Sequence, residues 1–193
     1  MKNIAIIDYG AGNTKSLTFA LQRLGYSRVE LTSDATSVQS ADYVIFPGVG
    51  HASYAMEQLR KTGLDTIIPD LKQPFLGICL GMQLMCSHSE EGDTPGLGIF
   101  SAQVLKFKGE QKVPHMGWNN VDFSSYDIEN HYNNSWFYFV HSYYADVIPQ
   151  TVGVTDYILP FSAVLQHDNF LGCQFHPEKS GEMGERFLTN FLK

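Results

Sequence analysis

The chain has 193 residues, of which 44% are hydrophobic, and a net charge of -7 at pH 7. The acidic balance argues against a nucleic-acid-binding protein, which usually carries a basic face, and no apolar run approaches the roughly 18 residues that span a membrane. The length suits one domain over 1–193. The three cysteines are odd in number and widely spaced, so we expect no disulfide framework and a reducing compartment, the cytoplasm.

The first half of the chain alternates short apolar runs with helical patterns. Residues 3–8 predict a buried first strand, because glycines close the apolar run, and an acid makes it a poor signal peptide. Further elements follow in order: a helix over 16–26, strands over 28–32 and 43–50, a helix over 52–63, a strand over 74–78 and a helix over 80–88. This alternation implies parallel strands joined by crossover helices, which is an α/β fold.

The second half is rich in short strands separated by turn residues. Strands are predicted over 102–107, 119–123, 136–144, 151–157, 161–168 and 170–176, and an amphipathic helix over 181–193. Asp168 and Asn169 mark a hairpin turn. We expect these strands partly to extend the sheet and partly to form an antiparallel layer beside it.

The string "GICLG" at 77–81 has the form of a nucleophile elbow. Glycines two positions before and after Cys79 allow a strand to turn sharply into a helix with the thiol exposed. The helix N-terminus favours the thiolate, and the N–H of Leu80 points to where an oxyanion would form. The alternative is a buried structural cysteine, which is how we interpret Cys86 and Cys173.

A general base for this thiol is suggested by "QFHPEKSG" at 174–181. His176 precedes a proline, which favours extended backbone, so His176 and Glu178 project to the same side. Glu178 can then hold one imidazole nitrogen and leave the other free to take the thiol proton. A solvated turn is the alternative; a metal site is not expected, since no C-x-x-C or H-x-x-x-H spacing is present.

A glycine-rich loop, "FPGVGH" at 46–51, follows another predicted strand. The carboxyl ends of parallel strands share one edge, so this loop and Cys79 can meet there. Its exposed N–H groups predict the second arm of an oxyanion hole, with Val49 and Gly50 as the candidate donors. A plain turn is the alternative.

Taken together, "PGVG", "GICLGMQL" and "QFHPEKSG" resemble the class I glutamine amidotransferases over nearly the whole chain. The strings "DYGAGN", "VPHMGWN" and "YFVHSYY" narrow the resemblance to the glutaminase subunits of imidazole glycerol phosphate synthase. The resemblance implies a flavodoxin-like three-layer sandwich. Its central sheet is mostly parallel, with helices on both faces and added antiparallel strands in the C-terminal half.

The resemblance also implies an activity, without a cofactor. Cys79 would attack the side-chain amide of L-glutamine, with His176 moving protons and Glu178 orienting it, and water would release glutamate from the thioester. The ammonia would pass to a cyclase subunit with a (β/α)₈ barrel, the heterodimer partner. There it would serve the synthesis of imidazole glycerol phosphate and aminoimidazole carboxamide ribonucleotide in histidine biosynthesis.

The family positions imply two further groups of residues. The substrate site would use Gly48, Gly50, Gln83, His141, Ser142 and Tyr143. The cyclase-facing surface would include Asn13, Trp118, Asn119, Tyr138 and Lys179. His141 is a rival general base, Gln83 could be an exposed helix residue, and Trp118 and Tyr138 could equally be core aromatics.

Three alternative functions are weighed against this interpretation of the sequence. The chain could be a glutaminase subunit of another class I amidotransferase synthase, since the order of cysteine, histidine and glutamate would be identical. A catalytically silent partner-binding module would require a lost nucleophile or base, and both are present. A thiol hydrolase or peptidase is disfavoured by "VHSYY" and by the strings that resemble partner-facing segments.

Overall fold

The computed structural model describes residues 2–10, 14–123, 132 and 135–193. Its first half contains β1 (Ile4–Ile7), α1 (Thr14–Arg23), β2 (Val29–Thr32), α2 (Ala35–Ser40), β3 (Tyr43–Gly48), α3 (Ala52–Thr62), α4 (Leu64–Ile67), the 3-10 helix η1 (Ile68–Asp70), β4 (Phe75–Cys79) and α5 (Leu80–Met85). Its second half contains β5 (His88–Ser89), β6 (Thr94–Pro95), β7 (Gln103–Lys106), β8 (His115–Asn120), β9 (Trp136–His141), β10 (Tyr143–Ala145), β11 (Thr151–Tyr157), β12 (Leu159–His167), β13 (Phe170–Cys173), the 3-10 helix η2 (Pro177–Lys179) and α7 (Gly181–Phe191).

One large mixed sheet runs through the molecule in the order β2-β1-β3-β4-β13-β12-β10-β7-β5-β6. The strands from β2 to β13 are all parallel, and β12, β10 and β7 follow as antiparallel neighbours. β11 pairs with β12, while β8 and β9 form a separate antiparallel ribbon. The predicted α/β class and the split role of the later strands are confirmed.

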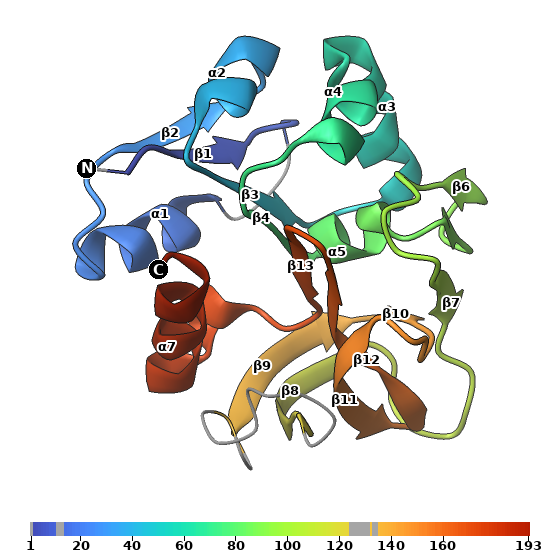
Figure 1. The fold of residues 1–193 in the computed structure, drawn as a ribbon. Coiled ribbons are helices and arrows are strands. Elements are labelled where there is room, and N and C mark those ends of the chain that lie inside the picture. Colours follow the sequence, from blue (N-terminus) through green and yellow to red (C-terminus); the bar gives the residue numbers. More distant parts are fainter. Residues whose placement is uncertain (1, 11–13, 124–131, 133–134) are drawn as a thin grey trace.

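Helices cover both faces of the parallel part of the sheet, with α1 and α7 on one side and α2 to α5 on the other (Figure 1). The inner strands β1, β3 and β4 are buried on both faces, so their side chains alternate between two cores. Ile4 and Ile6 of β1 pack with Leu21 of α1 and Leu188 of α7. Ile7 joins the opposite core with helices α2 to α5. This is the expected three-layer sandwich.

Several predicted boundaries were wrong, for tertiary reasons. The helix expected over 80–88 ends at Met85, because the backbone beyond it pairs with other segments and enters β5. The strand expected over 119–123 is β8, which begins four residues earlier at His115 and pairs with β9 along its whole length. The run 136–144 is divided at Ser142, where the chain leaves β8 and joins β7 and β12.

The hairpin turn was predicted correctly. His167 and Phe170 close a two-residue loop, and Asp168 has a positive φ of 50°. The helices α2 and α4 were not anticipated from the sequence. Asn13 lies outside the described residues, and within the described ranges every helix is too short or too polar to cross a membrane.

Candidate active site

Cys79 lies where β4 turns directly into α5, as the elbow motif predicts. It is the N-cap of α5 and has a φ of 54°, a strained value for a residue other than glycine. The flanking glycines are required by packing. A Cβ on Gly81 would overlap the carbonyl oxygen of Phe46, and one on Gly77 would overlap the sulfur of Met85. Close approach of α5 to β3 and β4 therefore holds the strained turn in place.

The pairing of β13 with β4 brings His176 to the same edge of the sheet. Cys173 is opposite Ile78 in this parallel pair, so the chain leaves β13 beside Cys79. The backbone N–H of His176 donates to Tyr138 at 2.9 Å, and its carbonyl accepts from Ser180 Oγ at 2.7 Å. These bonds fix the backbone from which the imidazole projects.

His176 and Glu178 form a buried pair, with both side chains 4% exposed and 2.9 Å between Nδ1 and Oε1. The pair was expected, but the extended backbone from which we predicted it was wrong: His176 is extended, whereas Pro177–Lys179 form the 3-10 helix η2, which turns Glu178 back toward the imidazole. Burial by itself lowers the pKa of His176, but the Cys79 thiolate and the Glu178 carboxylate outweigh it and raise that pKa to about 10. The imidazole is therefore protonated at neutral pH. Nε2, the nitrogen that Glu178 leaves free, has no hydrogen-bond partner among the described residues.

A cleft of about 340 Å³ opens over these groups. It is lined by Val49, Gly50, Cys79, Leu80, Gln83, Glu91, Pro114, Val140, His141, Ser142, Tyr143, His176 and Lys179. The volume is at the small end of ligand sites and suits a small molecule. The cleft therefore gathers most of the residues expected at the substrate from three separate strings of the sequence.

Gly48, unlike the other expected substrate residues, does not line the cleft. It lies in a buried position at the end of β3, where a Cβ would approach Leu80 Cβ at 2.7 Å. Its small size lets the loop after β3 approach the elbow closely. Gln83 is buried on α5, not exposed, and its Nε2 donates to the carbonyl of Tyr143 at 2.8 Å.

The two expected donors of the oxyanion hole, the N–H groups of Leu80 and of the Val49–Gly50 loop, are in different states in this structure. Leu80 follows Cys79 and lines the cleft. The N–H of Val49 donates to Tyr9 Oη at 3.1 Å, and Tyr9 Oη donates back to the Val49 carbonyl at 3.2 Å. The neighbouring Gly50 has a φ of 103°, which only glycine adopts readily. The Val49 donor is thus occupied by a hydroxyl.

His141 has both ring nitrogens engaged. Nδ1 lies 2.8 Å from the Tyr143 carbonyl, so it carries the proton, and Nε2 lies 3.0 Å from His115 Nδ1. Burial, the largest cause, lowers the pKa of His141 to about 3 and that of His115 to about 4. Both rings are neutral at physiological pH. This favours our interpretation of His141 as a wall of the site and not the general base.

Three contacts were missed by reading the sequence. Gln174 is fully buried, and its Nε2 lies 3.6 Å from Cys79 Sγ. It stands two residues before His176 in the strand predicted over 170–176, so alternation along that strand would have placed both side chains on one face. His115 and Ser180, which support His141 and His176, carried no comparable local signal.

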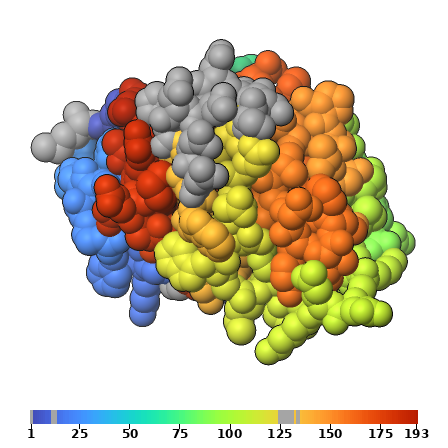
Figure 2. Space-filling view, turned by 90° about the horizontal axis from the view of Figure 1, so that it is seen from below, coloured from blue at the N-terminus to red at the C-terminus, as the bar shows by residue number. Residues whose placement is uncertain are grey.

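Of the expected partner-facing residues, the four that the structure describes lie on or near the β8–β9 ribbon: Trp118, Asn119, Tyr138 and Lys179. Trp118 is 53% exposed and meets Tyr138 edge-on at 6.1 Å, and Lys179 Nζ lies 6.0 Å from the Tyr138 ring. Trp118 is therefore not a core aromatic. Asn119 projects to the inner face, where its amide contacts His115 Nε2 at 3.3 Å. Figure 2 shows the yellow surface of β8 between red α7 and the orange C-terminal strands.

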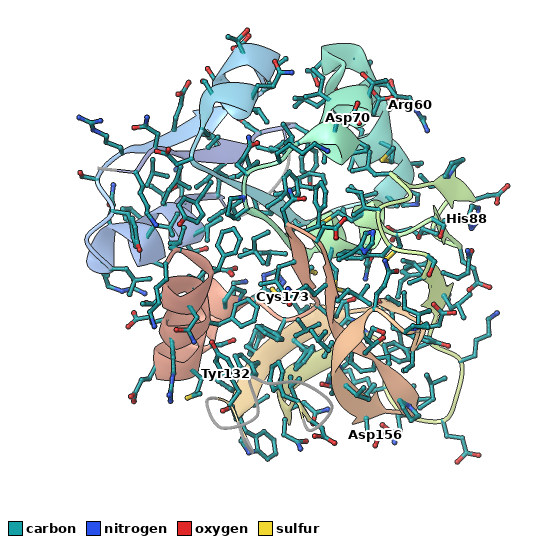
Figure 3. The ribbon with its side chains drawn as sticks, in the orientation of Figure 1. Arg60, Asp70, His88, Tyr132, Asp156 and Cys173 are labelled. Carbon is teal, nitrogen blue, oxygen red and sulfur yellow. The ribbon has the colours of Figure 1, made fainter. Side chains whose placement is uncertain are left out.

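The remaining candidate chemistry is limited. Among the residues that the structure describes, no group of three or more histidine, cysteine, aspartate or glutamate side chains is placed to hold a metal ion. Cys86 and Cys173 are buried away from the cleft, and burial raises the pKa of both thiols. Figure 3 shows Cys173 near the centre of the molecule.

The fold and the sequence define the class of protein. The family model "Glutamine amidotransferase class-I" matches residues 5–193. A solved structure of a glutamine amidotransferase has the same fold, with a TM-score of 0.75 at 16% identity over 98% of this chain and 96% of that one.

Closer relatives identify the branch. The imidazole glycerol phosphate synthase subunit HisH of Bacteroides fragilis (strain YCH46) is 53% identical over 98% of both chains. The subunit of the same name from Pasteurella multocida is 48% identical over 100% of this chain and 98% of its own length. The chain therefore belongs to the HisH family of class I glutamine amidotransferases.

Proposed function

We propose that the chain hydrolyses L-glutamine through a thioester on Cys79 and supplies the ammonia to the cyclase subunit of imidazole glycerol phosphate synthase, in histidine biosynthesis. One observation carries the proposal: a nucleophile at a strained elbow lines the same cleft as His176, whose imidazole is held from behind by the buried carboxylate of Glu178. Nucleophile, base and orienting acid are the groups that acyl transfer requires.

The reaction proceeds in two halves. The sulfur of Cys79 attacks the side-chain amide carbon of glutamine, and the protonated His176 gives its proton to the departing ammonia. The thioester carbonyl then receives a water molecule whose proton His176 takes up. Collapse of that intermediate breaks the C–S bond, releases glutamate and returns the electron pair to sulfur. Glu178 keeps Nδ1 occupied, so that Nε2 faces the reaction.

Gln83 contributes to substrate binding as an acceptor. Its Nε2 already donates to Tyr143 O and to Gln174 Oε1, both at 2.8 Å. Only its Oε1 can therefore serve a ligand, and it can receive an N–H of glutamine. His141, Ser142 and Tyr143 form another wall of the cleft. The N–H of Leu80 stabilises the oxyanion, and the Val49–Gly50 loop supplies the second donor once the Val49 peptide releases Tyr9 Oη and rotates toward the site.

The cyclase, a (β/α)₈ barrel, docks on the outer face of the β8–β9 ribbon. Met116, Trp118 and Trp136 are each more than half exposed there, which forms an apolar surface of a kind that favours a protein partner. Val140, on the same ribbon, lines the cleft. A partner on this face would therefore sit at the mouth from which ammonia leaves. The three cysteines are free, in keeping with work in the cytoplasm.

The function is tested by mixing the chain with purified cyclase candidates and measuring glutamate release and imidazole glycerol phosphate formation from glutamine. We expect both only with the cyclase of histidine biosynthesis. Trp118→Ala should weaken this complex and leave the thermal unfolding temperature unchanged. Glutamate release that responds instead to another synthase would favour the alternative, a glutaminase subunit of that synthase.

Tyr9→Phe is expected to raise glutaminase activity in the absence of a partner several-fold. The tyrosine hydroxyl holds both the N–H and the carbonyl of Val49, so its removal frees this peptide to rotate toward the oxyanion. Burial, first, and nearby negative charge raise the pKa of Tyr9, so the hydroxyl stays protonated and able to donate. Steady-state glutamate release without cyclase is the measurement.

The phenyl ring retains the edge-on contact with Phe46, whose ring centroid lies 5.8 Å away, so the fold should be preserved. Tyr54→Phe, at an exposed tyrosine on α3, is the matched control. An unchanged or lower basal activity in Tyr9→Phe would mean that the hydroxyl does not restrain the loop.

A further inference from the structure

We propose that Gln174 is a further catalytic residue, whose side-chain amide donates a hydrogen bond to the sulfur of Cys79 and stabilises its thiolate form. The inference rests on the proposed function and extends it to a residue outside the Cys79, His176 and Glu178 set. Nε2 of Gln174 lies 3.6 Å from Cys79 Sγ, within hydrogen-bond range for sulfur, and the residue is 0% exposed.

The position of Gln174 follows from the sheet. β13 and β4 pair in parallel with Cys173 opposite Ile78, so the next residue of each strand, Gln174 and Cys79, are also neighbours. The backbone N–H of Gln174 continues the ladder by donating to Ala163 of β12 at 2.8 Å. Cys173, labelled at the centre of Figure 3, marks the strand end from which Gln174 reaches the sulfur.

The orientation of the Gln174 amide is determined by its neighbours. The chain of hydrogen bonds starts at the Tyr143 carbonyl, which can only accept, so Gln83 must present Nε2 to it. The second hydrogen of that Nε2 points to Gln174, at 2.8 Å, so Gln174 must present Oε1 there. The NH₂ group of Gln174 is left facing the sulfur.

This arrangement has a chemical use. A thiolate in a buried site needs donors, and hydrogen bonds to a charged atom are stronger than those between neutral groups. The sulfur carries its negative charge before it attacks glutamine and again when the thioester C–S bond breaks and the electron pair returns to it. A fixed N–H donor assists at both moments, because it stabilises the resting nucleophile and the leaving thiolate.

The test measures the alkylation of Cys79 by iodoacetamide as a function of pH in the full chain, with the site of modification identified by mass spectrometry. In this reaction sulfur forms a bond to the CH₂ carbon and iodide leaves. For Gln174→Met we expect the midpoint of the pH profile to move up by about one unit and the rate at neutral pH to fall about tenfold.

Gln73→Met is the matched control. Gln73 is also hydrogen-bonded through both ends of its amide, at 2.9 Å to Val38 O and 3.3 Å to Lys72 N, but it lies away from the cleft. Its profile should match that of the unmodified chain. A purely structural role for Gln174 would lower the unfolding temperature and scale the rate equally at all pH values, without moving the midpoint.

Gln174→Leu provides the second variant, because it removes the NH₂ that faces sulfur without placing a negative charge beside the thiolate. If Gln174→Met does not fold, the pH profile of Cys79 alkylation in this second variant tests the proposal. A midpoint that stays at the wild-type value in the folded variants would overturn the proposal. Alkylation needs neither glutamine nor the cyclase, so a shifted midpoint in a chain that fails to hydrolyse glutamine would refute only the proposed function.

Discussion

Cys79→Ala is expected to lower the rate of glutamine hydrolysis by about 10⁴-fold or more, because it removes the atom that forms the thioester. No neighbouring group can replace it: Cys86 is buried and its Sγ lies 3.5 Å from the Met82 carbonyl, while Cys173 has a thiol pKa raised well above its usual range by burial. Glutamate release, with and without the cyclase, is the measurement.

The same variant should fold. Alanine retains the Cβ, and the close packing of the elbow depends on Gly77 and Gly81 and not on the sulfur. Binding to the cyclase should also persist, since the exposed face of the β8–β9 ribbon is unchanged. Cys86→Ala is the control, and a glutamine-like diazo-ketone should label Cys79 alone in it. Wild-type glutamate release from Cys79→Ala would refute the assignment.

His176→Ala should be as damaging as loss of the nucleophile, and Glu178→Ala should be milder by about one to two orders of magnitude. Loss of the base costs as much as loss of the nucleophile, because neither can catalyse the reaction without the other. Glu178 acts only through the imidazole, which it orients and whose charge it stabilises. The 2.9 Å contact between two buried side chains shows that the orienting bond is made. kcat and KM for glutamine, measured for both variants, check the order. Equal losses would assign Glu178 a second role.

The pair also predicts a pH dependence of stability. The Cys79 thiolate first, and the Glu178 carboxylate next, overcome the effect of burial and raise the pKa of His176 from 6.5 to about 10, so protonation stabilises the folded state. Glu178→Ala removes the second of these two contributions. The contribution of His176 to the unfolding free energy is fully present below about pH 6.5 and is lost as the pH rises through about 10. The difference in unfolding free energy between the wild-type chain and Glu178→Ala should therefore be largest below about pH 6.5 and should shrink above about pH 10. A difference that grows with pH would contradict the assigned charge.

Local rules were sufficient for part of the site. The elbow at Cys79 could be predicted because the glycines that permit it are two residues away. The His176–Glu178 pair could be predicted because its members are close in sequence, although Pro177–Lys179 form the 3-10 helix η2 and not the extended backbone that we expected. Alternation along the strand predicted over 170–176 would also have placed Gln174 on the same face as His176. The alternation of strands and helices likewise identified the parallel sheet, since each element has its own periodicity.

Only the tertiary structure determined the features of the site that depend on contacts between residues distant in sequence. The meeting of Cys79 with His176 requires β13 to lie beside β4, and no local pattern specifies that neighbour. The occupied N–H of Val49, the neutral His141 and the outward-facing Trp118 depend in the same way on Tyr9, His115 and the register of β8 with β9. Sequence by itself determined which side chains could react, through short-range geometry. Long-range pairing determined which of them touch, because strand order is set by the burial of the whole sheet.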